Sequence, residues 1–232
     1  MRFYLLSVLL IINFSLWAQR SSVYMIDLND LAFRSSKSST EWYKGKQGEY
    51  VEGSPFLEDS WSHGIMELKS DTALNNLEYR YNIYFKQMQI RTVNDTLILM
   101  HPEKVRALVF NNRKFVYQPY VLEELSGQDY FEILAEGKCN LLLRRDVSFM
   151  PKNPPVTPYS AGYIYDRFLL HENVYLQKAG SLAFFVKPTK KNVLKFLEDH
   201  QDELAAYAKI QNIKFNDNIS LAKLISYYNS LN

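Results

Sequence analysis

The chain has 232 residues, a length that is ample for a sizeable core in one or two domains. Its 27 Lys and Arg nearly balance its 25 Asp and Glu, and no local basic cluster stands out, so the sequence predicts neither nucleic-acid binding nor attachment to an anionic membrane surface. Hydrophobic residues make up 47% of the chain and aromatic residues 15%, which argues against wholesale disorder, and the lone cysteine excludes a disulfide framework within the chain.

The N-terminal segment has the pattern of an export signal. Met1–Arg2 gives a positive start, and residues 3–17 form a nearly uninterrupted apolar run. This run is about fifteen residues long, whereas a membrane-spanning helix needs roughly twenty, so it predicts a secretory signal peptide over residues 1–18. Cleavage after Ala18 would leave a mature protein in the periplasm or outside the cell, with no integral membrane span. An uncleaved anchor is the alternative, because Leu16 stands where cleavage sites prefer a small residue.

The next part of the chain divides into a polar lead-in and a series of strands. Residues 19–48 are polar and rich in serine, which is typical of a loosely ordered segment. From about residue 49, apolar and polar side chains alternate, as in Leu77–Ile83, and this period of two indicates half-buried strands. Short turn sequences such as Asn111–Asn112 separate successive strands, so neighbours must pair antiparallel, since a parallel return needs a dozen residues or more. Residues 49–150 are therefore predicted to form an antiparallel β-meander, either a curved sheet or a partial barrel.

A proline-rich segment interrupts the strands, and helices end the chain. The prolines of residues 151–160 remove backbone donors, which predicts a linker or an edge-covering loop. Strand character returns over residues 161–188, with turns expected at Glu172–Asn173 and at 179–181. Residues 189–232 change to a helical period and are predicted to form two or three helices. The candidate N-caps of these helices are Thr189, Asp199 and Asp217.

This order of elements predicts an α+β protein that is mainly β, with an antiparallel meander closed off by the C-terminal helices. The apolar stripe of the helical tail must be buried, either on a sheet face or, as the alternative, on a partner helix. An open meander also has edges that need to be covered or paired. A protein partner or a homodimer is therefore expected.

Several short runs occur in a definite order between residue 53 and the C-terminus. They are Gly53–Leu57, Arg80–Tyr84 followed by Gln87–Met88, Pro102–Val105, Tyr130–Leu134 with Glu136–Lys138, and Ile225–Leu231. Together they resemble a family of small exported proteins from the Bacteroidota. That family has no assigned activity, so the resemblance implies a Gram-negative envelope setting and supplies no catalytic residue.

The sequence shows no local catalytic or metal-binding constellation. The four histidines have no metal-ligand spacing, and neither a Gly-x-Ser-x-Gly run nor a Gly-rich phosphate loop occurs, so no catalytic residue, metal or cofactor is predicted. Cys139 falls on the apolar face of its strand and is expected in the core rather than as a nucleophile. Glu132 and Glu136 share one strand face, so a hydrolase with two carboxylates is weighed against ordinary solvated acids. The histidines are His63, His101, His171 and His200.

Aromatic side chains on the polar side of strands or near loops are the candidate ligand-binding residues. Their flat rings can stack on a sugar, a peptide or a lipid chain, although Tyr is also simply a favourable cross-strand residue. They are Trp42, Trp61, Tyr84, Tyr117, Tyr120, Tyr163 and Tyr165. With no catalytic group in view, the sequence predicts a non-catalytic secreted or periplasmic envelope protein that binds another protein or itself. The alternatives are a carrier of a small apolar or saccharide ligand and a hydrolase with a non-sequential site.

Overall fold

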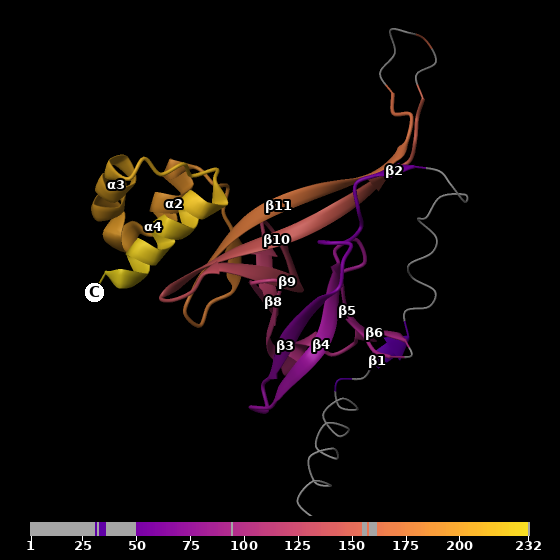
Figure 1. Cartoon of the computed structure of the whole chain (residues 1–232). Helices are drawn as coiled ribbons and strands as arrows, with labels where there is room; N and C mark the ends of the chain where they lie inside the picture. The colour runs from indigo at the N-terminus through magenta and orange to yellow at the C-terminus, as the bar shows by residue number, and fades with distance from the viewer. Residues whose placement is uncertain are drawn as a thin grey trace, which may run out of the picture.

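The computed structural model describes residues 31, 33–35, 50–93, 95–154, 157 and 162–231. The predicted signal peptide, most of the polar lead-in with Trp42, and part of the proline-rich segment lie outside these residues. The strands are β1 Phe33–Ser35, β2 Val51–Glu52, β3 Ser62–Leu68, β4 Ala73–Asn82, β5 Gln87–Arg91, β6 Thr96–Leu99, β7 Val105–Phe110, β8 Arg113–Leu122, β9 Leu125–Ala135, β10 Cys139–Met150, β11 Asp166–Lys178 and β12 Ala183–Phe185. The helices are the short 3-10 helices η1 Pro102–Lys104 and η2 Glu198–His200 and the α-helices α2 Lys190–Phe196, α3 Gln201–Ile210 and α4 Asn218–Ser230 (Figure 1). The predicted class, an α+β protein that is mainly β with C-terminal helices, is confirmed.

The twelve described strands form one sheet, in which most neighbours are also neighbours in the chain. The order departs from a simple meander where β7 returns beside β3 instead of following β6, whose other edge pairs with β1. β6 ends at Leu99 and β7 begins at Val105, and β5, β4 and β3 lie between these two strands in the sheet. Two strand pairs are parallel, β2 with β11 and β12 with β8, so the sheet is mixed rather than purely antiparallel.

Strands β8 to β12 close into a ring. β8, β9, β10 and β11 pair antiparallel in chain order, and β12 then pairs with both β11 and β8. The closing pair is parallel and aligns Ala183 with Tyr120. Four buried side chains fill the interior of the ring, namely Phe131, Leu142, Tyr175 and Ala183. Closure therefore involves the C-terminal half of the sheet and is completed by its last strand.

Two expected turns have different outcomes. Asn111 and Asn112 both have positive φ, 52° and 57°, which confirms the tight turn between β7 and β8. The turn expected at Glu172–Asn173 is wrong, because β11 runs unbroken through these residues. They pair with Arg145 and Arg144 of the neighbouring β10, whose long ladder and cationic side chains keep this polar stretch extended.

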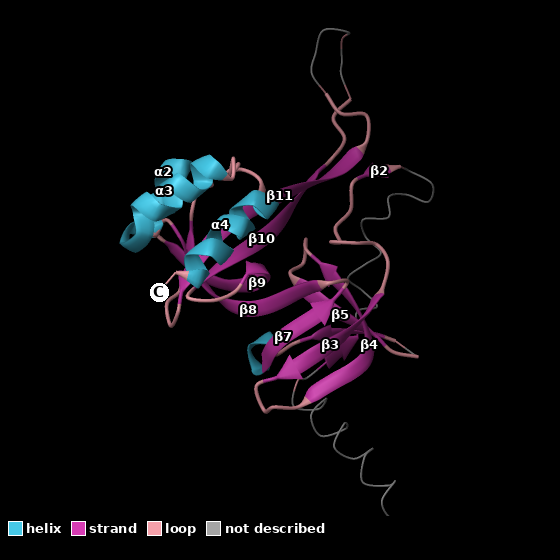
Figure 2. Ribbon diagram, turned by 60° about the vertical axis from the view of Figure 1, so that its left-hand side comes forward, coloured by secondary structure: helices cyan, strands magenta, loops and turns pink. Residues whose placement is uncertain are grey.

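The three α-helices cover the outer face of the ring, as Figures 1 and 2 show. Residues Leu141 and Leu143 of β10 alternate with the interior residue Leu142 and face outward. They share one hydrophobic cluster with Leu224 and Ile225 of α4. The apolar stripe of the helical tail is therefore buried on a sheet face.

The helix caps follow the sequence at two of the three expected positions. The Thr189 hydroxyl accepts a hydrogen bond from a backbone N–H in the first turn of α2, and Asp217 does the same for α4. Asp199 is not an N-cap, because it lies inside η2. Its carboxylate instead accepts hydrogen bonds from the Tyr228 hydroxyl at 2.6 Å and from the Lys178 ammonium at 3.2 Å, which ties α4 to the end of β11.

A second core lies where β3, β4, β5 and β7 meet the first half of the ring (Figure 2). Aromatic rings dominate it, with Phe110 and Phe115 stacked at 5.0 Å between centroids and Tyr81 edge-on to Tyr130 at 5.3 Å. Beyond both cores, β10 and β11 continue together as a two-stranded ribbon that projects from the body (Figure 1). The ribbon gives the molecule a long strand edge.

Candidate functional site

The structure spreads the predicted aromatic residues over separate places. Trp61 lies under Arg80, whose guanidinium carbon is 4.5 Å from a ring centroid. Tyr117 and Tyr120 occupy opposite faces of β8, because an odd number of positions separates them. Tyr117 packs edge-on against Tyr130 at 5.0 Å, whereas Tyr120 faces the interior of the ring.

The other three described candidates lie near the projecting ribbon. Tyr84 packs edge-on against Phe168 at 5.7 Å between centroids. Tyr163 and Tyr165 are exposed close to the ribbon's tip, and Tyr165 meets Tyr50 at 4.9 Å. The six described residues thus form no shared stacking surface, and ligand binding at any one of them stays a prediction.

Two adjacent arginines of β10 organise two separate charged networks. Arg144 lies on the inner face of the ring, where it stacks on Tyr120 at 4.5 Å and bonds Asp129 at 2.7 Å and Asp146 at 3.0 Å. Lys86 approaches the same two carboxylates from the β4–β5 turn, at 3.3 Å and 2.5 Å. Burial opposes the charge of Arg144, but the hydrogen bonds from its guanidinium to Asp129 and to a tyrosine outweigh it and raise the pKa of this group. The inner network balances two cations with two carboxylates.

The outer network has an excess of negative charge. Arg145 bonds Glu132 at 2.5 Å and Glu172 at 2.8 Å on the outer face of the ring. Arg113 lies 3.9 Å from Glu132 and 3.6 Å from Glu58. Two guanidinium groups therefore face three carboxylates, which leaves this network with a net charge of −1.

The residues weighed for catalysis are occupied in other ways. Glu132 is buried against Arg145, and Glu136 is exposed and pairs with Lys114 at 2.8 Å, so the two acids do not act on one site. Cys139 is fully buried, as expected, and desolvation raises the pKa of its thiol to about 11. At neutral pH this thiol is protonated and a poor nucleophile.

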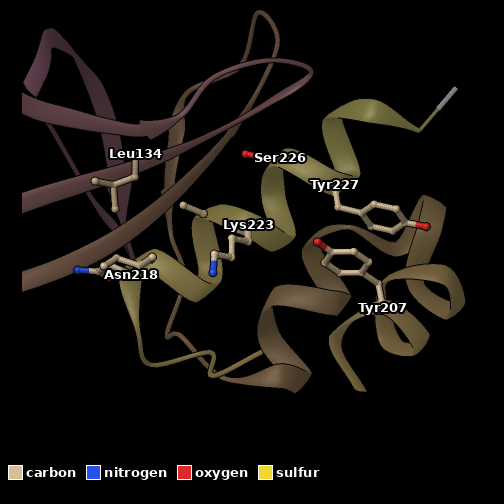
Figure 3. A pocket seen from close by; sticks show the side chains of 8 residues that line it. Leu134, Tyr207, Asn218, Lys223, Ser226 and Tyr227 are labelled. Carbon is tan, nitrogen blue, oxygen red and sulfur yellow. The ribbon is translucent and has the colours of Figure 1, made fainter. Parts of the chain in front are cut away.

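An open apolar groove of about 560 Å³ lies between α4, the end of α3 and β9 (Figure 3). One wall is the pair Tyr207 and Tyr227, whose rings stack in parallel at 3.9 Å between centroids. The floor and opposite wall come from Leu134 of β9 and Ala222 of α4. The polar and remaining apolar groups around it are Asn218, Ile219, Lys223 and Ser226.

The groove arises from a second face of α4. Its inner stripe is buried on the ring, while positions 219, 222, 223 and 226 follow the i, i+3, i+4, i+7 spacing of another face. Ile219 is 71% exposed at the rim, although isoleucine is among the residues most often buried. None of the residues that line the groove is fully buried, so it is a shallow surface that a second molecule can cover rather than an enclosed chamber.

Neither a metal site nor a membrane-spanning helix is found among the described residues. Among the described residues, His, Cys, Asp and Glu side chains nowhere gather in a group of three that would hold a metal ion. Within the same residues, no helix combines the length and the apolar character that crossing a membrane requires. Comparisons with protein-family models, curated proteins and solved structures find no significant match to this chain. The resemblance to exported Bacteroidota proteins stays a prediction.

Proposed function

We propose that this chain is a non-catalytic binding protein that holds a partner protein in the groove beside α4. The observation that carries the proposal is the apolar groove itself, with Ile219 exposed at its rim and the stacked pair Tyr207 and Tyr227 as its wall. Aromatic rings that are already fixed in place supply contact area at little entropic cost. A helix or short segment with apolar anchors at helical spacing would fit this surface in the recurring helix-in-groove mode.

The shape of the groove favours a protein over a small molecule. A pocket for a small ligand encloses most of the ligand's surface. Here Ile219, Lys223 and Ser226 are exposed and the other lining residues are half-buried, so a small molecule would stay largely in water. We further propose that binding takes place outside the cytoplasm, on the strength of the apolar run at residues 3–17.

Site-specific photo-crosslinking tests the proposal in the cells that make the protein. Benzoyl-phenylalanine is placed at Ile219, or at Ile210 as a control with nearly equal exposure, 71% and 73%. The expected result is a discrete protein adduct from position 219 and none from position 210. Filling the groove with Ala222→Trp should abolish the adduct, whereas Ala206→Trp on the exposed face of α3 should not.

Two other outcomes have clear meanings. An adduct at twice the mass of the chain, with a concentration-dependent mass in sedimentation, would identify a second copy as the partner. Equal adducts from both positions, or adducts that Ala222→Trp leaves unchanged, would contradict binding in the groove.

A further inference from the structure

The middle of β11 is exposed on both faces and along one edge. Leu170, His171 and Glu172 are consecutive residues of an unbroken strand, and all three are exposed, with Leu170 at 54%. In a strand with neighbours on both edges, at least one of the two faces is normally covered. Three exposed residues in a row therefore indicate a strand edge that water reaches.

The backbone groups of Leu170 and Glu172 point toward this open edge. The Val186 N–H donates to the carbonyl oxygen of Val174 at 3.0 Å, which shows that Val174 faces β12. Backbone groups alternate between the two edges of a strand, so positions 172, 170 and 168 face the same way. A Cβ added to Gly53 would lie 2.4 Å from the Phe168 carbonyl oxygen, which agrees with this alternation.

Short strands border the open edge at both ends. β2 pairs with β11 at Asp166 and Arg167, and β12 pairs with it at Tyr175 and Leu176. Between them, no strand among the described residues pairs with positions 169–173 on this edge. Five residues of strand give a gap about 16 Å long. Figure 1 shows this stretch of β11 running free between the helices and β2.

The borders of the gap decide what can enter it. Strands pair at a spacing of about 4.8 Å, and β2 and β12 already occupy that lateral position on either side. If the β11 edges of two copies met antiparallel, the β11 strand of each copy would collide with β2 and β12 of the other. A second copy cannot pair through this edge, whereas a single extended segment can.

The side chains at the gap define the chemistry of such a segment. Leu170 and Glu172 lie on one face of β11, two positions apart, so their cross-strand neighbours on an added strand also lie on one face. Leu170 favours an apolar neighbour. Glu172 belongs to the outer network with its net charge of −1, and although Arg145 and the Asn218 amide contact it, its side chain is 40% exposed. It therefore favours a cationic neighbour.

We propose that the open stretch of β11 receives an extended segment of another protein as an added strand, with an apolar side chain beside Leu170 and a lysine or arginine beside Glu172. Main-chain hydrogen bonds to these two residues hold the segment, and the side chains at the gap select it. This site adjoins the groove beside α4 through Asn218, which contacts Glu172, but it uses the main-chain groups of β11 and does not depend on binding in the groove.

A symmetric peptide probe tests the proposal. The fluorescent peptide Thr-Val-Thr-Lys-Thr-Val-Thr places valine two positions from lysine in either chain direction, and a second peptide with glutamate in place of lysine is its control. Each labelled peptide is titrated with the full chain, and the fluorescence anisotropy of the peptide is measured. The lysine probe should bind, and the glutamate probe should bind at least about tenfold more weakly. The amides of Leu170 and Glu172 should exchange rapidly without the probe and become protected with it, while those of His171 and Asn173, which face β10, stay protected throughout.

Two variants keep the test decisive. Leu170→Pro removes an N–H that points to the open edge and spares the ladder with β10, so the protein should keep its melting temperature and lose probe affinity by about tenfold or more. Glu172→Gln should keep the fold and abolish the preference for the lysine probe over the glutamate probe. This second variant remains informative even if Leu170→Pro does not fold.

Three results would overturn the proposal. The first is no binding of the lysine probe at millimolar concentration. The second is unchanged exchange at Leu170 and Glu172 when the probe binds. The third is a concentration-dependent mass that Leu170→Pro abolishes, which would show that the edge pairs with a second copy after all.

Discussion

The inside and the outside of the strand ring bury apolar surface in different ways. Inside, Phe131 and Tyr175 come from the strands themselves and need no other element. Outside, Leu141 and Leu143 require a layer of helices, with Leu224 at its centre. The helical layer has an outer face as well as the inner face that packs on the ring. It also covers only part of the ring's longest strands, β10 and β11. The groove on α4 and the open edge of β11 are the two surfaces that result.

The largest effect is expected inside the ring. Phe131→Ala leaves a cavity among rings that cannot collapse into it, so the free energy of unfolding should fall by about 3–5 kcal/mol. Urea titration followed by circular dichroism measures this. Phe184→Ala removes a ring that is 40% exposed on β12 and should cost much less. Equal losses for the two variants would mean that the interior is not the main core of the ring.

A smaller loss is expected in the helical layer. Leu224→Ala removes a fully buried side chain between α4 and the ring, at a cost of about 3 kcal/mol. Because the interior of the ring does not include α4, hydrogen exchange should accelerate more in the helices than in β9 and β10. Uniform acceleration through both would show that ring and helices unfold only as one unit.

The Asn229 side chain bonds the end of α4 to the backbone of β10. The amide of Asn229 accepts from the Cys139 N–H at 2.8 Å and donates to the Cys139 carbonyl oxygen at 2.9 Å. Asn229→Ala leaves both backbone groups without this partner and should lower the free energy of unfolding by about 1–2 kcal/mol. Ser230→Ala, one position further along, is the control, and it should leave the urea midpoint nearly unchanged.

The smallest effect is expected for the stability of the helical layer at acid pH. Burial works against the charge of Asp199, but hydrogen bonds from Tyr228 and Lys178 outweigh it and lower the pKa of this carboxyl. A carboxyl whose pKa is lower in the folded state contributes stability above its unfolded pKa, and that contribution disappears as pH falls below about 4. Asp199→Asn should therefore flatten the acid limb of a melting-temperature profile. Asp202 is an exposed residue in the first turn of α3, and Asp202→Asn should leave that limb unchanged. A limb that stays steep in Asp199→Asn would contradict the stabilising role of the Asp199 carboxylate.

Local patterns predicted the elements better than their partners. Alternation identified the strands, and Asn111–Asn112 identified a turn, because both depend on neighbouring residues alone. The return of β7 to β3 and the closure by β12 depend on contacts between distant residues, which no local period contains. Local spacing likewise predicts Asp199 as an N-cap, whereas its actual partners, Tyr228 and Lys178, lie far away in the sequence.

The candidate surfaces were only partly visible in the sequence. The inner stripe of α4 followed helical spacing, but its outer face, with Ile219 and Ala222, becomes a groove only because β9 and α3 lie beside it. The polar pair Glu172–Asn173 suggests a turn, but in the structure it lies in the part of β11 where the edge meets water. A polar interruption within a long strand can therefore indicate an exposed edge as well as a bend.

Closure of the ring also sets an order of events during synthesis. The closing pair joins residues 120 and 183, which are 63 positions apart, so the seam cannot form until nearly the whole chain has left the ribosome. Until then Tyr120 and Val121 of β8 lack their β12 partner and pair with β9 alone, and the aromatic residues behind them are open to water and to other nascent chains. A product that stops short of β12 should consequently aggregate, even though it contains most of the strands.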